Sequence, residues 1–317
     1  MKIIVPEFVL PAIQEETCAL LRACDFVTID ARGALHGDIT GAEVLMLPWH
    51  LPPDVQAEIL SLPTVRWVHA ASAGVDHALG DTLREHPATL TNARGVFDGP
   101  IAETVLSYML MIAKRMPAFL RQQQEHRWHK LKLQELTGLR VGLVGLGHIG
   151  SEIAQRCQAF GMQVIATRRH PERGDPYVDQ MLPPEQLDQL LAAADFVVVA
   201  LPLTEETRHI IGAEQLREMR ADAWLINIAR GAIIDTSALL HALREGWIAG
   251  AALDVFDEEP LPEDSPFWDM ENVIITPHNS WSTPHVLERE ARLFLDNLRR
   301  YLRDEPLRNV VDKARGY

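Results

Sequence analysis

Residues 141–150 read VGLVGLGHIG, and their pattern indicates the class of fold. Its first four residues have the apolar pattern of a buried strand, and the segment that continues to Phe160 repeats apolar residues at helical spacing. Gly145, Gly147 and Gly150 occupy the turn between the two elements. A strand, a glycine-rich turn and a helix in this order are typical of the first unit of a doubly wound parallel sheet.

The three glycines have different physical roles in such a turn. Gly145 permits a tight reversal, Gly147 permits close approach of a pyrophosphate, and Gly150 permits the helix to pack on the strand. The amide groups at the start of the helix, where His148 and Ile149 lie, donate to phosphate oxygens. We therefore predict a dinucleotide site, with a glycine turn that binds nothing as the structural alternative.

The end of the next strand determines which dinucleotide is favoured. Chains that bind NAD usually carry an acidic residue about 20 residues past the glycine turn, where it holds the ribose 2'-hydroxyl. This chain instead has Arg168 and Arg169 there, in a protein that is otherwise acidic. A guanidinium pairs with a 2'-phosphate, whereas a carboxylate repels it. The sequence therefore favours NADP(H) over NAD(H), with a solvated basic loop as the alternative interpretation.

Short apolar strands alternate with helical patterns along the whole chain, which is typical of βαβ units and parallel sheets. In the first third, strands are predicted at residues 2–5, 26–29, 44–47, 66–69 and 89–91. After a long helix that opens at Asp98, six more are predicted at residues 139–144, 163–166, 196–200, 224–228, 249–255 and 273–275. A last helix, at about residues 284–302, places one apolar face on a core, formed by Leu287, Ala291, Phe294, Leu298 and Leu302.

Composition and charge exclude several classes of protein. The 317 residues include 44 acidic and 30 basic side chains, and the resulting formal charge of -14 repels nucleic acids and anionic membranes. The longest apolar stretch, from Val105 to Ala113, is too short for a membrane span, and the amino terminus lacks the pattern of a secretory signal. Neither the three cysteines nor the histidines show metal-ligand spacing, so we expect a cytoplasmic protein without a metal.

Polar residues follow three predicted strands of the second sheet. Arg230 comes after the strand at 224–228, Glu259 after the strand that contains Asp254, and His278 after the strand at 273–275. Ligands of open parallel sheets bind beyond the carboxyl ends of the strands, so these side chains are expected to converge. An arginine binds a carboxylate through two hydrogen bonds, and a histidine beside a carboxylate transfers a proton. Each residue taken singly is common in proteins without such a site.

These segments together resemble the D-isomer-specific 2-hydroxyacid dehydrogenases. The resemblance covers almost the whole chain and rests on segments at residues 71–76, 92–103, 141–150, 227–231, 252–260 and 276–278. It implies hydride transfer between nicotinamide and the C2 carbon of a small 2-oxoacid or 2-hydroxyacid. In this mechanism His278 is the acid/base, Glu259 is its partner, and Arg230 clamps the substrate.

The same resemblance implies further contacts. The backbone of Ala73 and Gly74 is expected to bind the substrate carboxylate, and Asp254 to contact the nicotinamide amide. Arg168, the Trp49-His50 pair and the closing residues 313–317 make the chain most similar to the glyoxylate/hydroxypyruvate reductases. Trp49 and Trp281 are candidates to line a small substrate pocket, with plain packing as the alternative. The other candidate cofactor-binding residues are His148, Ile149, Arg169, Pro202, Ile228, His278 and Ser280.

A domain organisation is also implied. A Rossmann cofactor domain, residues 98–282, is inserted into a flavodoxin-like substrate domain made of residues 1–97 and 283–317, and both are α/β domains with doubly wound parallel sheets. In the family that the chain resembles, the long helix from Pro100 and the arm through Trp128 form a dimer interface, so the resemblance also implies a homodimer. Two alternatives stay open: a phosphite-type dehydrogenase on the same scaffold, and a non-catalytic regulator that senses a dinucleotide.

Overall fold

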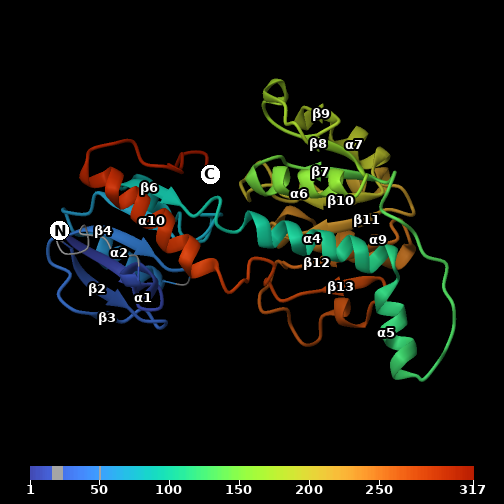
Figure 1. Cartoon of the computed structure of the whole chain (residues 1–317), viewed down its shortest axis with the longest axis horizontal. Coiled ribbons are helices and arrows are strands. Elements are labelled where there is room, and N and C mark those ends of the chain that lie inside the picture. Colours follow the sequence, from blue (N-terminus) through green and yellow to red (C-terminus); the bar gives the residue numbers. More distant parts are fainter. Residues whose placement is uncertain (16–23, 50) are drawn as a thin grey trace. The chain divides into compact units, whose positions relative to one another are not determined.

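A computed structural model describes residues 1–15, 24–49 and 51–317. The chain divides into two compact units, which we describe one at a time (Figure 1). Unit 1 contains Met1–Phe97 and Ser282–Tyr317, and unit 2 contains Asp98–Trp281. Both units are built on mostly parallel sheets covered by helices, which confirms the predicted α/β fold class.

Unit 1 has a six-stranded sheet with the order β3-β2-β1-β4-β5-β6. All neighbouring strands are parallel except β2 and β3. Without β3, the order β2-β1-β4-β5-β6 is that of a flavodoxin-like sheet, in which the second strand lies outside the first. The bounds are β1 Lys2–Pro6, β2 Asp25–Ile29, β3 Leu35–His36, β4 Ala42–Leu47, β5 Trp67–Ala70 and β6 Thr89–Asn92. The sequence interpretation missed β3, whose two residues are too few for any periodicity.

Four described helices accompany this sheet: α1 Leu10–Glu15, α2 Pro53–Leu60, α3 Asp81–Glu85 and α10 Val286–Leu302. Helix α10 returns from the end of the chain and buries Ala291, Phe294 and Leu298 in one cluster with residues of β1, β4 and β5. The Phe294 ring stacks on Trp67 of β5 with the centroids 5.1 Å apart. Two residues predicted on this face, Leu287 and Leu302, are exposed, and they lie in the first and last turns of the helix.

Helix α10 also buries a carboxyl group. Glu290 is only 3% exposed, and its Oε1 atom has no hydrogen-bond partner among the described residues. Burial disfavours the charged form and raises the pKa of Glu290 to about 8. The group is therefore protonated in the folded protein at neutral pH, whereas in the unfolded chain it is ionised.

We expect the free energy of unfolding to fall as the pH rises from 4.5 to 8, because over this range the folded chain holds a proton that the unfolded chain has lost. The slope from this group is about 1.4 kcal/mol per pH unit, and the total is on the order of 4 kcal/mol. In denaturant titrations, the free energy of unfolding of Glu290→Gln should match that of the wild type near pH 4.5 and exceed it near pH 8. Parallel pH profiles for the two proteins would contradict this assignment.

Unit 2 has a seven-stranded parallel sheet with the order β13-β12-β11-β10-β7-β8-β9. The first six strands counted from β7 follow the Rossmann order. The strands after β7 are added on one side of it up to β9, and the strands from β10 onward are added on its other side. The bounds are β7 Arg140–Val144, β8 Gln163–Thr167, β9 Gln180–Leu182, β10 Phe196–Val199, β11 Trp224–Asn227, β12 Gly250–Leu253 and β13 Val273–Ile275. The prediction of six strands was incomplete, because the short edge strand β9 lacks an apolar run.

The helices of unit 2 are α4 Asp98–Ala113, α5 Met116–Gln124, α6 His148–Ala159, α7 Leu187–Ala193, α8 Ala213–Glu218 and α9 Thr236–Glu245. Short 3-10 turns lie at Pro171–Arg173, Pro184–Gln186, Gly231–Ile233 and Pro266–Asp269. Helices α4 and α6 lie side by side (Figure 1). Helices α7, α8 and α9 contribute to one large apolar core with the strands. This arrangement leaves the carboxyl ends of the strands for the polar loops described next.

Candidate functional site

The glycine turn between β7 and α6 has two glycines that the packing requires and one that borders open space. Gly145 has φ +97, and a Cβ there would lie 2.7 Å from the Leu201 side chain. A Cβ on Gly150 would lie 2.9 Å from the Gly145 carbonyl oxygen. A Cβ on Gly147 would meet nothing within 4 Å. The turn therefore keeps a concave backbone at the helix amino terminus, which fits the pyrophosphate of a dinucleotide.

The basic residues after β8 have different environments. Arg169 forms an ion pair with Glu206 at 2.9 Å, and His170 lies 3.3 Å from Glu172. Arg168 is half-buried, and one Nη atom donates to the Gly174 carbonyl at 3.1 Å. No carboxylate of the described chain forms an ion pair with Arg168. Its charge is thus available to a 2'-phosphate, and it stands one residue past Thr167, whose hydroxyl accepts from the Gly145 amide at 3.1 Å.

At the carboxyl edge of the sheet, His278 and Glu259 form a close pair. The His278 Nδ1 atom lies 2.7 Å from a carboxylate oxygen of Glu259, and the other oxygen accepts from the Phe256 amide at 2.9 Å. Burial alone would raise the pKa of Glu259, but the hydrogen bonds from His278 and Phe256, together with the charges of His278 and Arg230, hold this pKa below its ordinary value. Glu259 is therefore an ionised partner for the imidazole.

The backbone of His278 is positioned by Asp254, the residue after β12. The His278 amide donates to the Asp254 carbonyl at 2.7 Å, and φ of His278 is +49. The fully buried Asp254 carboxylate accepts from the Thr276 hydroxyl and from the amides of Asn279 and Ser280, at 2.9 and 3.0 Å. These hydrogen bonds allow Asp254 to orient the histidine segment. The contact of Asp254 with the nicotinamide amide, which the resemblance implies, stays a prediction.

A tyrosine that the sequence interpretation did not single out extends this network. The Tyr108 hydroxyl of α4 lies 2.5 Å from the Thr276 hydroxyl, and because Thr276 donates to Asp254, Tyr108 donates to Thr276. Burial, opposed by the Thr276 hydrogen bond, raises the pKa of Tyr108 to about 12. Only a helical apolar pattern marked residue 108 in the sequence, so its polar contact had no local signal.

The loop that carries Arg230 packs tightly on the loop that carries Glu259. The Asn227 side chain donates to the Arg230 carbonyl at 2.9 Å and accepts from the Ala229 amide at 3.1 Å. A Cβ on Gly231 would lie only 2.0 Å from the Phe256 carbonyl carbon. Backbone contact at Gly231 thus brings the guanidinium segment beside the segment that holds Glu259, as the convergence of strand ends predicted.

The remaining candidates of unit 2 lie around these loops. Ile228 and Ser280 are buried, and Pro202 is exposed with its carbonyl accepting from the Thr207 hydroxyl at 2.7 Å. His148 is exposed, with Nδ1 3.8 Å from the carboxylate of Asp98. Ile149 is half-buried. The Trp281 indole donates to the His278 carbonyl at 2.9 Å, so this side chain covers the histidine backbone.

Ala73, Gly74 and Trp49 belong to unit 1. The Ala73 carbonyl accepts from the Asn92 side chain at 2.7 Å, and the Gly74 carbonyl accepts from the Ser72 hydroxyl at 2.7 Å. The Trp49 ring stacks on His77 with the centroids 4.7 Å apart. All three candidates follow the carboxyl ends of β4 or β5. His50, part of the pair that suggested the subgroup, lies outside the described residues.

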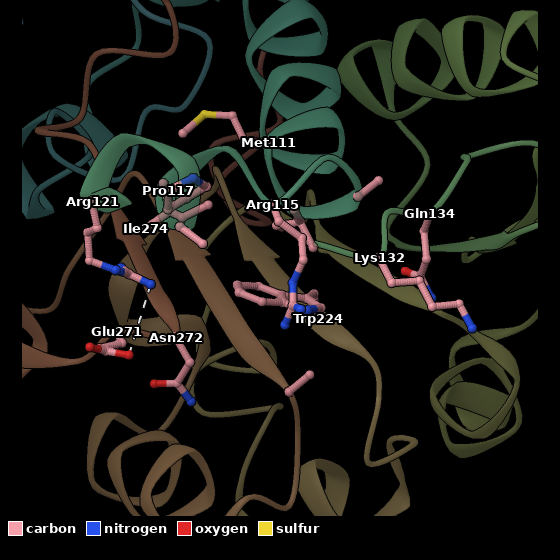
Figure 2. A pocket seen from close by; sticks show the side chains of 14 residues that line it. Met111, Arg115, Pro117, Arg121, Lys132, Gln134, Trp224, Glu271, Asn272 and Ile274 are labelled. Carbon is pink, nitrogen blue, oxygen red and sulfur yellow. Dashed lines mark ion pairs between the residues drawn. The ribbon is translucent and has the colours of Figure 1, made fainter. Parts of the chain in front are cut away.

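Unit 2 also has a hollow of about 590 Å³ at the opposite edge of its sheet (Figure 2). Trp224 and Asn272, at or before the amino ends of β11 and β13, form part of its wall. Helix α5 contributes Arg121, which lies 3.9 Å from Glu271. None of the candidate site residues lines this hollow.

Similarity to known proteins shows the family of this chain. The family model "D-isomer specific 2-hydroxyacid dehydrogenase, NAD binding domain" matches residues 106–280. A glyoxylate reductase of Korarchaeum cryptofilum is 35% identical over 276 residues, 83% of this chain and 81% of the relative. The chain belongs to the D-isomer specific 2-hydroxyacid dehydrogenases, and it is an NAD(P)H-dependent oxidoreductase of that family.

Two solved structures are similar over the full length. A D-isomer specific 2-hydroxyacid dehydrogenase from Xanthobacter autotrophicus, in complex with NADPH and MES, has 33% identity and a TM-score of 0.88, covering 100% of this chain and 99% of that one. An NADPH-dependent glyoxylate/hydroxypyruvate reductase from Sinorhizobium meliloti, in complex with NADP and sulfate, has 28% identity and a TM-score of 0.84, with coverage of 100% and 99%. These matches do not favour the phosphite-type or the regulator alternative. Across the described residues, no helix is both long and apolar enough to cross a membrane.

Proposed function

We propose that this chain reduces small 2-oxoacids, glyoxylate and hydroxypyruvate among them, with NADPH as the reductant. The observation that carries the proposal is the 2.7 Å pair between His278 Nδ1 and Glu259, beside the Arg230 loop and on the same edge of the sheet as the glycine turn. The relatives that are a glyoxylate reductase and a glyoxylate/hydroxypyruvate reductase support this choice of substrates.

In the proposed mechanism, the glycine turn and Arg168 would hold the dinucleotide, whose nicotinamide would supply a hydride to the C2 carbon. His278 supplies the proton: with Nδ1 bonded to the Glu259 carboxylate, Nε2 is the nitrogen that donates to the carbonyl oxygen, and the product is the 2-hydroxyacid. Glu259 fixes the orientation of the ring through its contact with Nδ1. Arg230 binds the substrate and places positive charge where the oxygen becomes negative.

Substrate recognition in this proposal also uses unit 1. The amide groups of Ala73 and Gly74 bind the substrate carboxylate, and Trp49 limits the size of the group attached to C2. The contacts of the neighbouring carbonyls with Asn92 and Ser72 support the first assignment, since they hold the loop in one conformation. The stacking of Trp49 on His77 supports the second, because it fixes the plane of the indole.

Turnover tests the proposed function directly. NADPH oxidation is followed at the nicotinamide absorbance band. We expect oxidation with glyoxylate and hydroxypyruvate, and slower oxidation with a bulky 2-oxoacid. Pyruvate reports whether the hydroxyl of hydroxypyruvate contributes. A purified, folded protein that binds NADPH but reduces none of the four substrates would overturn the proposal in favour of the regulator.

The cofactor preference is proposed to depend on Arg168. We expect Arg168→Asp to lower kcat/KM for NADPH by about 10²-fold, since it removes a charge-assisted hydrogen bond and adds repulsion of the 2'-phosphate, while kcat/KM for NADH changes little or rises. Arg289→Asp makes the same change of charge at an exposed position of α10 and is the control. A wild type that prefers NADH, or an unchanged ratio in the variant, would refute the role of Arg168.

We further propose a homodimer built through α5 and the segment 125–135. In the structure α5 buries none of its residues, and Trp128 is 97% exposed. Met116, Leu120 and Leu133 are 42%, 50% and 44% exposed. Several large apolar side chains exposed on one helix and the segment after it are typical of a protein–protein interface. Light scattering should give twice the chain mass, and Trp128→Asp should shift the equilibrium toward the monomer; a monomeric wild type would refute the proposal.

A further inference from the structure

A short segment of unit 1, residues 92–94, lies directly beside the loop of Ala73 and Gly74. Strands β5 and β6 are parallel neighbours with Ala70 opposite Asn92, so the residues that follow them leave the sheet at the same edge. The Ala93 amide donates to the Ser72 carbonyl at 2.9 Å, and the Asn92 side chain donates to the Ala73 carbonyl at 2.7 Å. The two loops are therefore bonded to each other at two points.

The other side of this segment is fixed by the end of the chain. The Asn309 side chain donates to the Arg94 carbonyl at 2.8 Å, and the Asn92 amide donates to the Asn309 carbonyl at 3.1 Å. Val310 pairs with Thr91 as an antiparallel bridge. The backbone at Arg94 is thus held between the substrate loop and the carboxyl-terminal segment, so its side chain starts from a fixed point.

The Arg94 guanidinium has no partner among the described residues. The side chain is partly buried, and its Nε atom is buried without a hydrogen-bond acceptor. Neither an ion pair nor a hydrogen bond from the guanidinium to the described part of the chain occurs, although the protein has 44 acidic residues. A partly buried guanidinium that lacks acceptors is unfavourable unless a ligand supplies them. The arrangement is suited to an anion that arrives from outside the protein.

We propose that Arg94 is a substrate-binding residue that takes a carboxylate of the 2-oxoacid. This inference rests on the proposed function, because it places the substrate at the loop of Ala73 and Gly74. A planar guanidinium with a fixed backbone presents two parallel donors to a carboxylate. Together with the amides of that loop, Arg94 recognises the anionic end of the substrate.

The carboxylate has two possible sources, which substrates distinguish. Glyoxylate carries only the C1 carboxylate, whereas oxaloacetate carries a second one. If Arg94 binds the C1 group, Arg94→Gln raises KM about tenfold for both substrates, with kcat within a factor of three. If it binds the second group, KM rises for oxaloacetate alone. Arg94→Lys, which keeps the charge but loses the planar fork, should restore part of the affinity in either case.

A binding measurement separates this inference from the proposed function. Oxalate, which is not reduced, is titrated by calorimetry into the NADP-loaded wild type, Arg94→Gln and the control Arg289→Gln. We expect about tenfold weaker oxalate binding in Arg94→Gln if the C1 carboxylate is the target, and malonate is the corresponding probe for a second carboxylate. Unchanged KM for both substrates and unchanged affinity for both probes would overturn the proposal. If Arg94→Gln does not fold, the same titrations with Arg94→Lys test the proposal. A wild type that is inactive but binds oxalate more tightly than the Arg94 variant refutes only the proposed function.

Discussion

His278→Ala is expected to lower kcat for glyoxylate reduction by about 10²- to 10⁴-fold, because the variant loses the proposed proton donor to the carbonyl oxygen. The substrate KM should change much less, since the variant keeps the groups proposed to bind the carboxylate. Steady-state kinetics with saturating NADPH measure both constants. A variant that retains kcat/KM within a factor of three of the wild type would rule out the proposed role of His278.

Two further variants separate chemistry from positioning. Glu259→Gln keeps an oxygen that can accept from Nδ1 but removes the negative charge, so we expect a smaller loss of kcat than in His278→Ala. His285→Ala is the matched control, because His285 is an exposed histidine seven positions further along the chain whose contact is Glu288 at 3.8 Å. An equal loss in the control would indicate a structural effect instead of lost proton transfer.

The strands that build the two sheets were largely predictable because most of them are buried on both faces. Such strands have continuous apolar runs, and β7 and β10 are examples in unit 2. The two strands that were missed, β3 and β9, have two and three residues and lie at sheet edges. At that length a strand depends on pairing with its neighbour, which is a property of the assembled sheet and leaves little trace in the local sequence.

The face of the last helix shows where periodicity fails. The apolar pattern predicted Leu287 and Leu302 in the core, yet both are exposed, while Glu290 and Asn297 are buried. Asn297 is buried because its side chain accepts from the Arg308 amide at 2.8 Å and donates to the Arg308 carbonyl at 3.2 Å. A polar residue that closes the next loop is satisfied inside the protein, and that requirement cannot be read from a helical repeat.

The candidate site was predictable to the extent that it depends on strand ends. Glu259 and His278 each follow a strand of one parallel sheet, and topology alone brings their segments to the same edge. The hydrogen bonds that hold these segments in place were not predictable. Tyr108 reaches Thr276 across 168 positions of sequence, and the Asp254 carboxylate reaches amides 25 and 26 positions away. Such contacts arise only when distant elements are assembled.

Gly231→Ala is expected to be the most disruptive single-methyl substitution at the site. Its Cβ would lie 2.0 Å from the Phe256 carbonyl carbon and 2.2 Å from the Asp257 nitrogen, and both atoms belong to the backbone. No rotamer change relieves such a clash, so one of the two loops must move. We expect a loss of about 3 kcal/mol or more in the free energy of unfolding, measured by denaturant titration.

The same substitution should reduce activity by more than the loss of folded protein explains. One of the two loops carries Arg230, and the other holds the Glu259 carboxylate through the Phe256 amide. Movement of either loop therefore displaces the Glu259–His278 pair relative to the Arg230 guanidinium. Displacements of this kind at a catalytic centre lower kcat about 10²-fold. Gly80→Ala is the matched control, since a Cβ there meets nothing within 4 Å and φ is -72. If Gly231→Ala keeps both the stability and the kcat of the wild type, the close approach of the two loops does not hold the site together.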